Sequence, residues 1–274
     1  MRILLTGAAG QLGRALGPAL RGHDRIALDR GSLDITDLGA VRAAVEAHRP
    51  DLLLNAAAYN DVDGAESQPE TAFRVNAVGP RNLALATAER SAAILHVSTD
   101  YVFDGEAGRA YHEYDRPNPL SVYGASKLAG ETSVRELNPR HFVVRTAWLY
   151  AKGGRNFPEA ILAQYGRESV RVVGDQVGSP TYAPHLADAI ARLLATPAYG
   201  TYHLAGAGAV SWFDVAQALY KRLGIPTTID RVTTAEFPRA ARRPRYSALT
   251  TLQEPRIALP PWEEGIEAFA RMAR

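Results

Sequence analysis

The sequence predicts a doubly wound α/β fold, in which helices cover both faces of a mainly parallel sheet. Three observations predict it. Short apolar runs alternate with longer helical patterns through the first 150 residues, a glycine-rich turn follows the first run, and small or hydroxyl-bearing residues end several later runs. Strands that alternate with helices imply right-handed crossovers, which produce parallel sheets.

The expected elements follow in chain order. Short aliphatic runs predict strands over residues 3–5, 25–28, 51–54, 93–97 and 142–145. Apolar residues that recur every three or four positions predict helices over residues 11–20, 40–47, 80–88 and 124–135. These elements form the expected first domain, residues 1–150.

Beyond residue 150, glycine and proline interrupt the pattern more often. We therefore expect a second, smaller lobe over residues 151–274. Within it, residues 184–195 and 200–204 predict one helix and one strand, and we expect this stretch of 184–204 to pack back on the first domain. Residues 261–274 predict a terminal helix.

The composition favours a small-molecule ligand. The 274 residues include 31 basic and 29 acidic side chains, so the formal charge is +2. Such a balance gives no field that would attract nucleic acid or an anionic membrane. Cysteine is absent, which excludes disulfides, thiolate metal sites and cysteine nucleophiles.

No targeting or membrane segment is expected. The first apolar run stops at Gly7, too soon for the core of a signal peptide. No later stretch approaches the ~20 apolar residues that span a bilayer. We therefore expect a soluble, cytoplasmic protein that contacts neither membrane nor nucleic acid.

The glycine-rich turn predicts a dinucleotide site of the Rossmann type. Gly7, Gly10 and Gly13 follow the first strand and open a helix, with Gln11 and Leu12 between the last two glycines. Glycines allow a tight turn and a close approach of the backbone to a pyrophosphate, and the helix N-terminus supplies N–H donors. The position after the first strand makes this short pattern informative.

Residues after the second strand bear on the choice of cofactor. Asp29 lies where an acid can accept hydrogen bonds from the ribose hydroxyls of NAD(H), and Arg30 could hold the 2′-phosphate of NADP(H). The pair leaves NADH and NADPH both open. Asp34 and Ile35 suit an adenine contact, although a turn or capping role for Asp34 is equally compatible.

A phenol and an ammonium form the second constellation. Tyr123 and Lys127 lie four residues apart at the start of a predicted helix, hence on one face. A nearby cation favours phenolate and should lower the pKa of Tyr123 towards neutrality. Thr99 ends a strand and could hydrogen-bond an oxygen that gains negative charge, with Ser98 as the alternative donor.

Small residues end another predicted strand. Ala56, Ala57 and Ala58 would let the nicotinamide end of the cofactor lie against the backbone. Because the carboxyl ends of parallel strands share one edge of the sheet, we expect these residues near Thr99.

Longer strings carry a resemblance. They read NAAAYNDVD over residues 55–63, STDYVF over 98–103, RTAWLY over 145–150 and DQVGSPT over 175–181. With the glycine turn and the Tyr-Lys pair, they resemble the dTDP-4-dehydrorhamnose reductase family of the extended short-chain dehydrogenase/reductase superfamily. The similarity runs through most of the chain.

The resemblance implies roles for particular residues. It makes Thr99, Tyr123 and Lys127 catalytic, and Thr99, Asp100 and Trp148 contacts of a dTDP-sugar substrate. At the cofactor, NADPH or NADH, it implies Gly10, Gln11, Leu12, Asp29, Asp34, Ile35, Ala57, Ala58, Tyr123 and Lys127. Trp148 could equally be a core aromatic.

One departure concerns metal. Some family members form magnesium-bridged dimers through a glutamate two positions after the last glycine of the turn, where this chain has Ala15. We therefore expect no metal site and either a monomer or a metal-independent homodimer.

The implied function is NAD(P)H-dependent reduction of the 4-keto group of dTDP-4-dehydro-L-rhamnose. One alternative is a nucleotide-sugar 4-epimerase or 4,6-dehydratase. Dehydratases typically follow the active-site threonine with Asp-Glu, whereas Asp100 is followed here by Tyr101. The other alternative is a non-catalytic, NADP-binding regulatory subunit.

Overall fold

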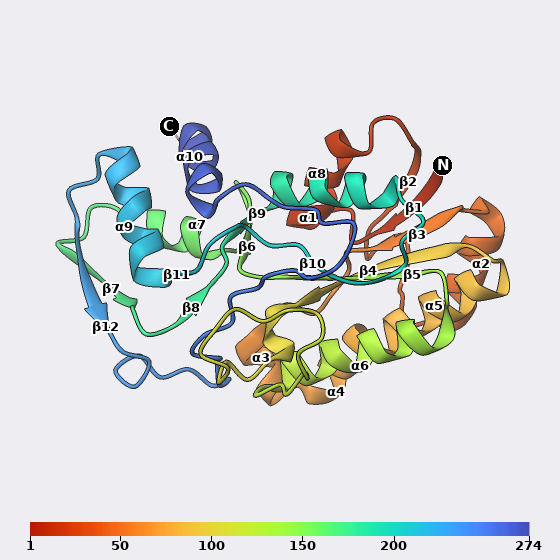
Figure 1. Cartoon of the computed structure of the whole chain (residues 1–274), viewed down its shortest axis with the longest axis horizontal. Coiled ribbons are helices and arrows are strands. Elements are labelled where there is room, and N and C mark those ends of the chain that lie inside the picture. The colour runs from red at the N-terminus through yellow and green to blue at the C-terminus, as the bar shows by residue number, and fades with distance from the viewer. Residues whose placement is uncertain (274) are drawn as a thin grey trace.

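Six parallel strands form the central sheet of the computed structural model, which describes residues 1–273 (Figure 1). Their order is β10-β5-β4-β3-β1-β2. The strands are β1 (Arg2–Thr6), β2 (Asp24–Leu28), β3 (Leu52–Asn55), β4 (Ala93–Thr99), β5 (His141–Thr146) and β10 (Gly200–His203). The predicted doubly wound parallel sheet is confirmed.

Helices cover both faces of this sheet (Figure 1). On one face, α1 (Gln11–Ala19) and α8 (Ala183–Leu194) enclose an apolar core with alternate residues of the strands. On the other face lie α2 (Leu38–His48), α5 (Gly79–Glu89) and α6 (Val122–Leu137). Strands buried on both sides explain why their sequences are continuously apolar rather than alternating.

Several regions differ from the expected elements, and among them are α7 (Phe157–Leu162), α9 (Trp212–Leu223) and the short strands between residues 149 and 232 outside β10, which were not predicted. Helix α6 begins at Val122, two residues before the predicted start, because the Ser121 hydroxyl caps it by accepting from the Gly124 N–H at 3.1 Å. Residues 62–78, predicted as no element, form α3 (Val62–Ser67), α4 (Pro69–Phe73) and the π-helical turn η1 (Arg74–Val78). A short 3₁₀ turn, η2 (Asp100–Val102), follows β4.

The remaining elements gather around a second apolar cluster. They are α7 (Phe157–Leu162), α9 (Trp212–Leu223), α10 (Trp262–Ala273) and the strand pairs β7 (Ser169–Val173) with β12 (Thr228–Val232), β8 (Val177–Gly178) with β11 (Val210–Ser211), and β6 (Leu149–Tyr150) with β9 (Thr181–Tyr182). Helix α8 packs on α1, and β10 pairs with β5. The division at residues 1–150 and 151–274 stays a prediction, and residue 274 of the predicted terminal helix lies outside the described residues.

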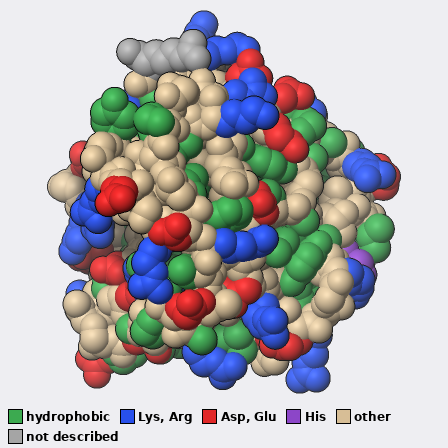
Figure 2. Space-filling view, turned by 90° about the vertical axis from the view of Figure 1, so that its left-hand side faces the viewer, with side chains coloured by type: hydrophobic (Ala, Val, Ile, Leu, Met, Phe, Trp, Pro, Cys, Tyr) green, Lys and Arg blue, Asp and Glu red, His purple; other side chains and the backbone are tan. Residues whose placement is uncertain are grey.

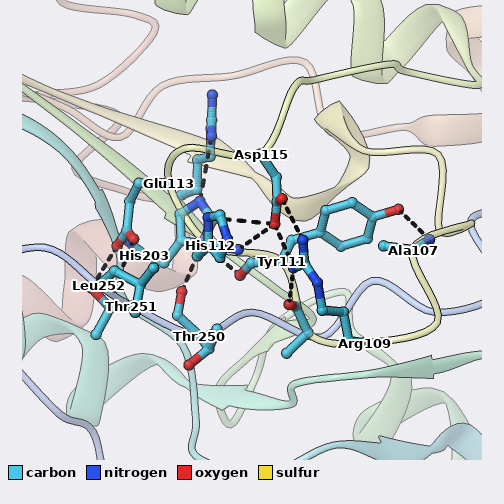
Figure 3. Close-up of polar contacts among 12 residues, drawn as sticks. Ala107, Arg109, Tyr111, His112, Glu113, Asp115, His203, Thr250, Thr251 and Leu252 are labelled. Atoms are coloured by element: carbon cyan, nitrogen blue, oxygen red, sulfur yellow. Dashed lines mark hydrogen bonds and ion pairs between the residues drawn. The ribbon is translucent and has the colours of Figure 1, made fainter.

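Polar contacts tie distant segments together beside the sheet. Glu113 accepts from the backbone N–H of His203 at 2.8 Å, from the Thr251 hydroxyl at 2.6 Å and from the Leu252 N–H at 3.0 Å (Figure 3). The Nδ1 atom of His203 lies 3.0 Å from the Thr250 carbonyl. These contacts hold the C-terminal segment against β10 and the loop after β4.

The surface agrees with the near-neutral composition. Over the end of the molecule that carries β7, β12 and α9, basic and acidic side chains are interspersed without a broad patch of one sign (Figure 2). Among residues 1–273, no helix combines the length and apolar character needed to cross a membrane.

Candidate active site

A cleft with a cavity volume of about 290 Å³ opens at the carboxyl edge of the sheet. The predicted site residues that line it are Gly10, Gln11, Leu12, Ala56, Ala58, Thr99, Asp100, Tyr123, Lys127 and Trp148. The glycine turn, the end of β4 and the start of α6, which are far apart in sequence, therefore meet at one site. This edge is where doubly wound sheets bind ligands.

Thr99, Tyr123 and Lys127 come together at this edge. Thr99 is the last residue of β4, and its hydroxyl donates to Asp100 Oδ1 at 3.1 Å and lies near the phenol of Tyr123. The two residues of α6 are one turn apart, and the Lys127 ammonium donates to the Val97 carbonyl at 2.7 Å. All three side chains are buried, so they keep one geometry.

Burial dominates the protonation of this pair. It raises the pKa of Tyr123 to about 12, against the opposing effect of the nearby Thr99 hydroxyl. It lowers the pKa of Lys127 to about 8, against the favourable charge of Glu131. The predicted lowering of the Tyr123 pKa is wrong for the protein alone, because burial disfavours the phenolate and the charge of Asp100 adds to the rise. At neutral pH the phenol holds its proton.

A buried ion pair lies behind the catalytic edge. Glu131, one turn after Lys127 on α6, accepts from Arg145 Nε at 2.9 Å and Arg145 Nη2 at 2.8 Å, and from the Ser98 hydroxyl at 2.6 Å. The Nη1 atom of Arg145, on β5, also lies 3.4 Å from His203 Nε2. The ends of β4, β5 and β10 are thus joined to α6 by one hydrogen-bonded network.

A second group of hydrogen-bonded polar side chains lies on three neighbouring strands of the sheet. Thr6, Asn55 and His96 occupy paired positions on β1, β3 and β4. The Thr6 hydroxyl donates to Asn55 Oδ1 at 2.7 Å, and Asn55 Nδ2 lies 3.0 Å from His96 Nδ1. Asn55 Oδ1 also accepts from the Ala57 N–H at 3.1 Å. This group orients the loop of small residues after β3.

The glycine turn fits a dinucleotide pyrophosphate. Gly10 precedes α1 and provides no side-chain cap, so the first N–H groups of the helix are left for a ligand. Gly7 has φ +72°, and a Cβ there would lie 2.5 Å from the Ala57 nitrogen. Gln11 Oε1 accepts from the Ala151 N–H at 3.0 Å, which fixes the turn against the loop after β6.

Two indoles form the outer wall of the cleft. Trp148 stacks on Trp212 with ring centroids 3.4 Å apart and an interplanar angle of 6°. Its φ of +46° is left-handed, a conformation that costs a residue with a bulky side chain about 1–3 kcal/mol. A Cβ on Gly178 would lie 2.3 Å from the Trp148 ring, so glycine makes room for it.

Comparisons with known proteins bear on this geometry. The family model described as the RmlD substrate binding domain matches residues 1–274. The chain belongs to this family.

Relatives in sequence carry consistent names. A dTDP-4-dehydrorhamnose reductase of Streptomyces griseus is 46% identical over 258 residues, which are 90% of this chain and 85% of the relative. One of Mycobacterium tuberculosis (strain ATCC 25618 / H37Rv) is 43% identical over 98% of this chain and 91% of the relative.

Solved structures agree. A dTDP-4-dehydrorhamnose reductase of Clostridium acetobutylicum has a TM-score of 0.96 and 40% identity, covering 100% of this chain and 99% of that one. One of Bacillus anthracis, solved in complex with NADP, has a TM-score of 0.96 and 40% identity, covering 99% of both chains. A UDP-glucose 4-epimerase of Thermus thermophilus, 22% identical with a TM-score of 0.76, shares the fold.

The other predicted cofactor residues lie outside the cleft lining. They are Gly7, Gly13, Asp29, Arg30, Asp34, Ile35 and Ala57. Gly13 is packed so closely that a Cβ would lie 2.3 Å from the Gly7 carbonyl oxygen, and Ile35 is buried. Asp29 Oδ1 accepts from the Ser32 N–H at 2.9 Å, and Asp34 Oδ1 accepts from the Thr36 N–H at 2.9 Å. Both carboxylates form turn contacts after β2.

The cleft contains residues that sequence reasoning did not assign. They are Asn60, Val62, Val97, Tyr101, Thr146, Leu149, Arg155 and Trp212, besides Ser98, the alternative donor. Asn60, Tyr101 and Leu149 lie within family strings, so those strings were the available signal. Trp212 follows a helix cap and lies in none of these strings.

Within residues 1–273, no group of three or more His, Asp or Glu side chains could hold a metal ion.

Proposed function

We propose that this chain reduces the 4-keto group of dTDP-4-dehydro-L-rhamnose to give dTDP-L-rhamnose, with NADPH or NADH as cofactor. The single observation that carries the proposal is the meeting of Thr99, Tyr123 and Lys127 beside the glycine turn in one cleft. The names of the relatives support the substrate.

The side chains divide the chemistry. Bound nicotinamide cofactor supplies hydride. Tyr123 Oη supplies the proton to the C4 oxygen, and Thr99 Oγ1 hydrogen-bonds the same oxygen. The Lys127 ammonium stabilises the negative charge left on Tyr123. The raised pKa of Tyr123 suits reduction, because a proton donor has to hold its proton before the reaction.

Other residues would hold the ligands. The N-terminus of α1, with Gly10, Gln11 and Leu12, suits the cofactor pyrophosphate, and Ala56 and Ala58 leave room for the nicotinamide end. Asp100 and Trp148 would contact the sugar nucleotide. We also propose a cytoplasmic location and a monomer or metal-independent homodimer.

A turnover assay tests the function. Purified protein with dTDP-4-dehydro-L-rhamnose and NADPH should consume the cofactor, seen as loss of absorbance by the reduced nicotinamide, and form one dTDP-L-rhamnose for each NADPH. A 4-epimerase or 4,6-dehydratase regenerates its cofactor and would consume none. A regulatory subunit would bind NADPH without turnover.

Cofactor choice gives a further prediction. Asp29→Ala should weaken the binding of NADH more than the binding of NADPH. A carboxylate favours the two free ribose hydroxyls of NADH, whereas Arg30 can neutralise the 2′-phosphate of NADPH. Dissociation constants measured by fluorescence titration would show it. Asp24→Ala, at the opposite end of β2, is the control and should change neither. Equal weakening of both cofactors by Asp29→Ala would place Asp29 away from the ribose.

Chelation gives another prediction. Mg²⁺ needs oxygen ligands. Some relatives supply one from a glutamate on the first helix, but this chain has Ala15 at that position, and its methyl group cannot bind a metal ion. We expect full turnover after exhaustive treatment with EDTA, and a sedimentation coefficient that does not change with Mg²⁺. Turnover that falls with EDTA and returns with Mg²⁺ would contradict this expectation.

A further inference from the structure

Asp100, directly after the catalytic threonine, is held in an unusual environment. Its carboxylate is buried, with 2% of the residue exposed. Oδ1 lies 3.1 Å from the Thr99 hydroxyl, and Oδ2 lies 2.5 Å from the hydroxyl of Ser247. Both carboxylate oxygens therefore have hydroxyl partners, one in the cleft and one on the distant C-terminal segment.

The surroundings of Asp100 contain phenols but no paired cation. The titratable groups that face it are Tyr101 on its own turn and Tyr123 on α6. Arg243, the nearby cation of the C-terminal segment, bonds Asp63 and Tyr101. Among residues 1–273, no ion pair compensates Asp100, so burial raises its pKa to about 7, with the bonds from Ser247 and Thr99 opposing.

The Thr99 hydroxyl has one proton and two acceptor positions. One acceptor position takes the Tyr101 N–H at 3.2 Å. When Asp100 is ionised, the Thr99 proton points to Oδ1, since a carboxylate can only accept. When Asp100 is neutral and donates from Oδ1, Thr99 accepts that bond and its own proton is free to point into the cleft.

Ser247 decides which oxygen of neutral Asp100 carries the proton. If the Ser247 hydroxyl donates to Oδ2, the proton of Asp100 is left on Oδ1, facing Thr99. We propose that the Asp100 and Ser247 pair orients the hydroxyl proton of Thr99, so that Thr99 donates to the substrate carbonyl when Asp100 is protonated and to Asp100 when it is ionised. This inference rests on the proposed reductase function and makes both residues positioning residues.

Rate profiles against pH test the inference. For the wild type, kcat/KM should fall about tenfold per pH unit above pH ~7, as ionised Asp100 withdraws the Thr99 donor. Asp100→Asn should lack the fall near pH 7 and keep only the later fall above about pH 8, where Lys127 loses its proton. Its amide can accept from Ser247 and donate to Thr99 at every pH, which mimics neutral Asp100.

Ser247→Ala leaves the carboxyl in place and keeps the test available if Asp100→Asn fails to fold or loses turnover. It removes a hydrogen bond that stabilises the carboxylate, so the fall should move to higher pH. Thr234→Val is the control, since it removes a hydroxyl bonded to Asp175 at 2.7 Å outside the cleft lining and should not move the fall. A fall near pH 7 that is unchanged in Asp100→Asn or in Ser247→Ala would overturn the inference.

Infrared spectroscopy separates this inference from the function itself. The difference between wild type and Asp100→Asn should contain a protonated carboxyl band at about pH 5 that disappears with a midpoint near neutrality. This band needs no turnover, so it survives failure of the proposed reaction. A carboxyl already ionised at about pH 5 would overturn the inference even in an active reductase.

Discussion

Tyr123→Phe is expected to lower kcat by about 10²- to 10⁴-fold, the usual loss when one positioned proton donor is removed. The phenol is buried beside Thr99, and its raised pKa keeps the proton available at neutral pH. The ring remains, so packing against Tyr101, whose centroid lies 6.0 Å away, should survive. Steady-state rates with saturating NADPH would measure the loss.

Two readouts separate chemistry from folding in this variant. NADPH affinity should stay close to that of the wild type, because phenylalanine preserves the shape of the site. Tyr220→Phe is the matched control, as it removes a buried phenol bonded to the Ile161 carbonyl at 2.9 Å outside the cleft lining. Undiminished turnover in Tyr123→Phe would remove the phenol from the mechanism.

Arg145→Met is expected to cost about 3 kcal/mol of unfolding free energy. Arg145 and Glu131 form a pair whose side chains are 3% and 0% exposed. Removing the guanidinium leaves a buried carboxylate with less compensation. The cost should lie at the lower end of the range for such pairs, because Arg135 still donates to Glu131 at 2.9 Å. Urea unfolding at neutral pH would measure it.

The pH dependence of this cost has a definite sign. Burial alone would raise the folded-state pKa of Glu131, but the bonds and charge of Arg145, with Ser98 and Arg135, together lower it below its ordinary value of 4.5. The pair therefore stabilises the fold above that pH and loses its contribution as the pH falls. Arg42→Met, which breaks an exposed pair with Glu89, is the control and should change stability little. Equal losses in both variants would contradict the importance of burial.

The central sheet could be predicted because its signals are local. Aliphatic runs such as Leu52–Asn55 and the glycine turn depend on neighbouring residues, so the strands and α1 were expected close to their observed bounds. The turn η1 was not, because its shape depends on tertiary contacts. Asn76 inside it accepts from the Tyr59 N–H and donates to the Tyr59 carbonyl, 17 residues away.

The residues of the candidate site also divide into those that local sequence signals predict and those that depend on tertiary contacts. Tyr123 and Lys127 could be paired from helical spacing alone, and Thr99 from its place at a strand end. Ser247 could not, because it reaches Asp100 across 147 positions of sequence. Tyr123 also shows that a predicted neighbour does not settle protonation, since burial raises its pKa although Lys127 lies one turn away on α6.

Transfer of isotope to the sugar tests the central claim most directly. The protein would be given dTDP-4-dehydro-L-rhamnose and NADPH deuterated at nicotinamide C4, in separate reactions for each face of the ring. Proton NMR and mass spectrometry of the product would locate the label. We predict one deuterium at C4 of dTDP-L-rhamnose from one of the two labelled cofactors. Product without deuterium from either cofactor, or no product, would contradict the account.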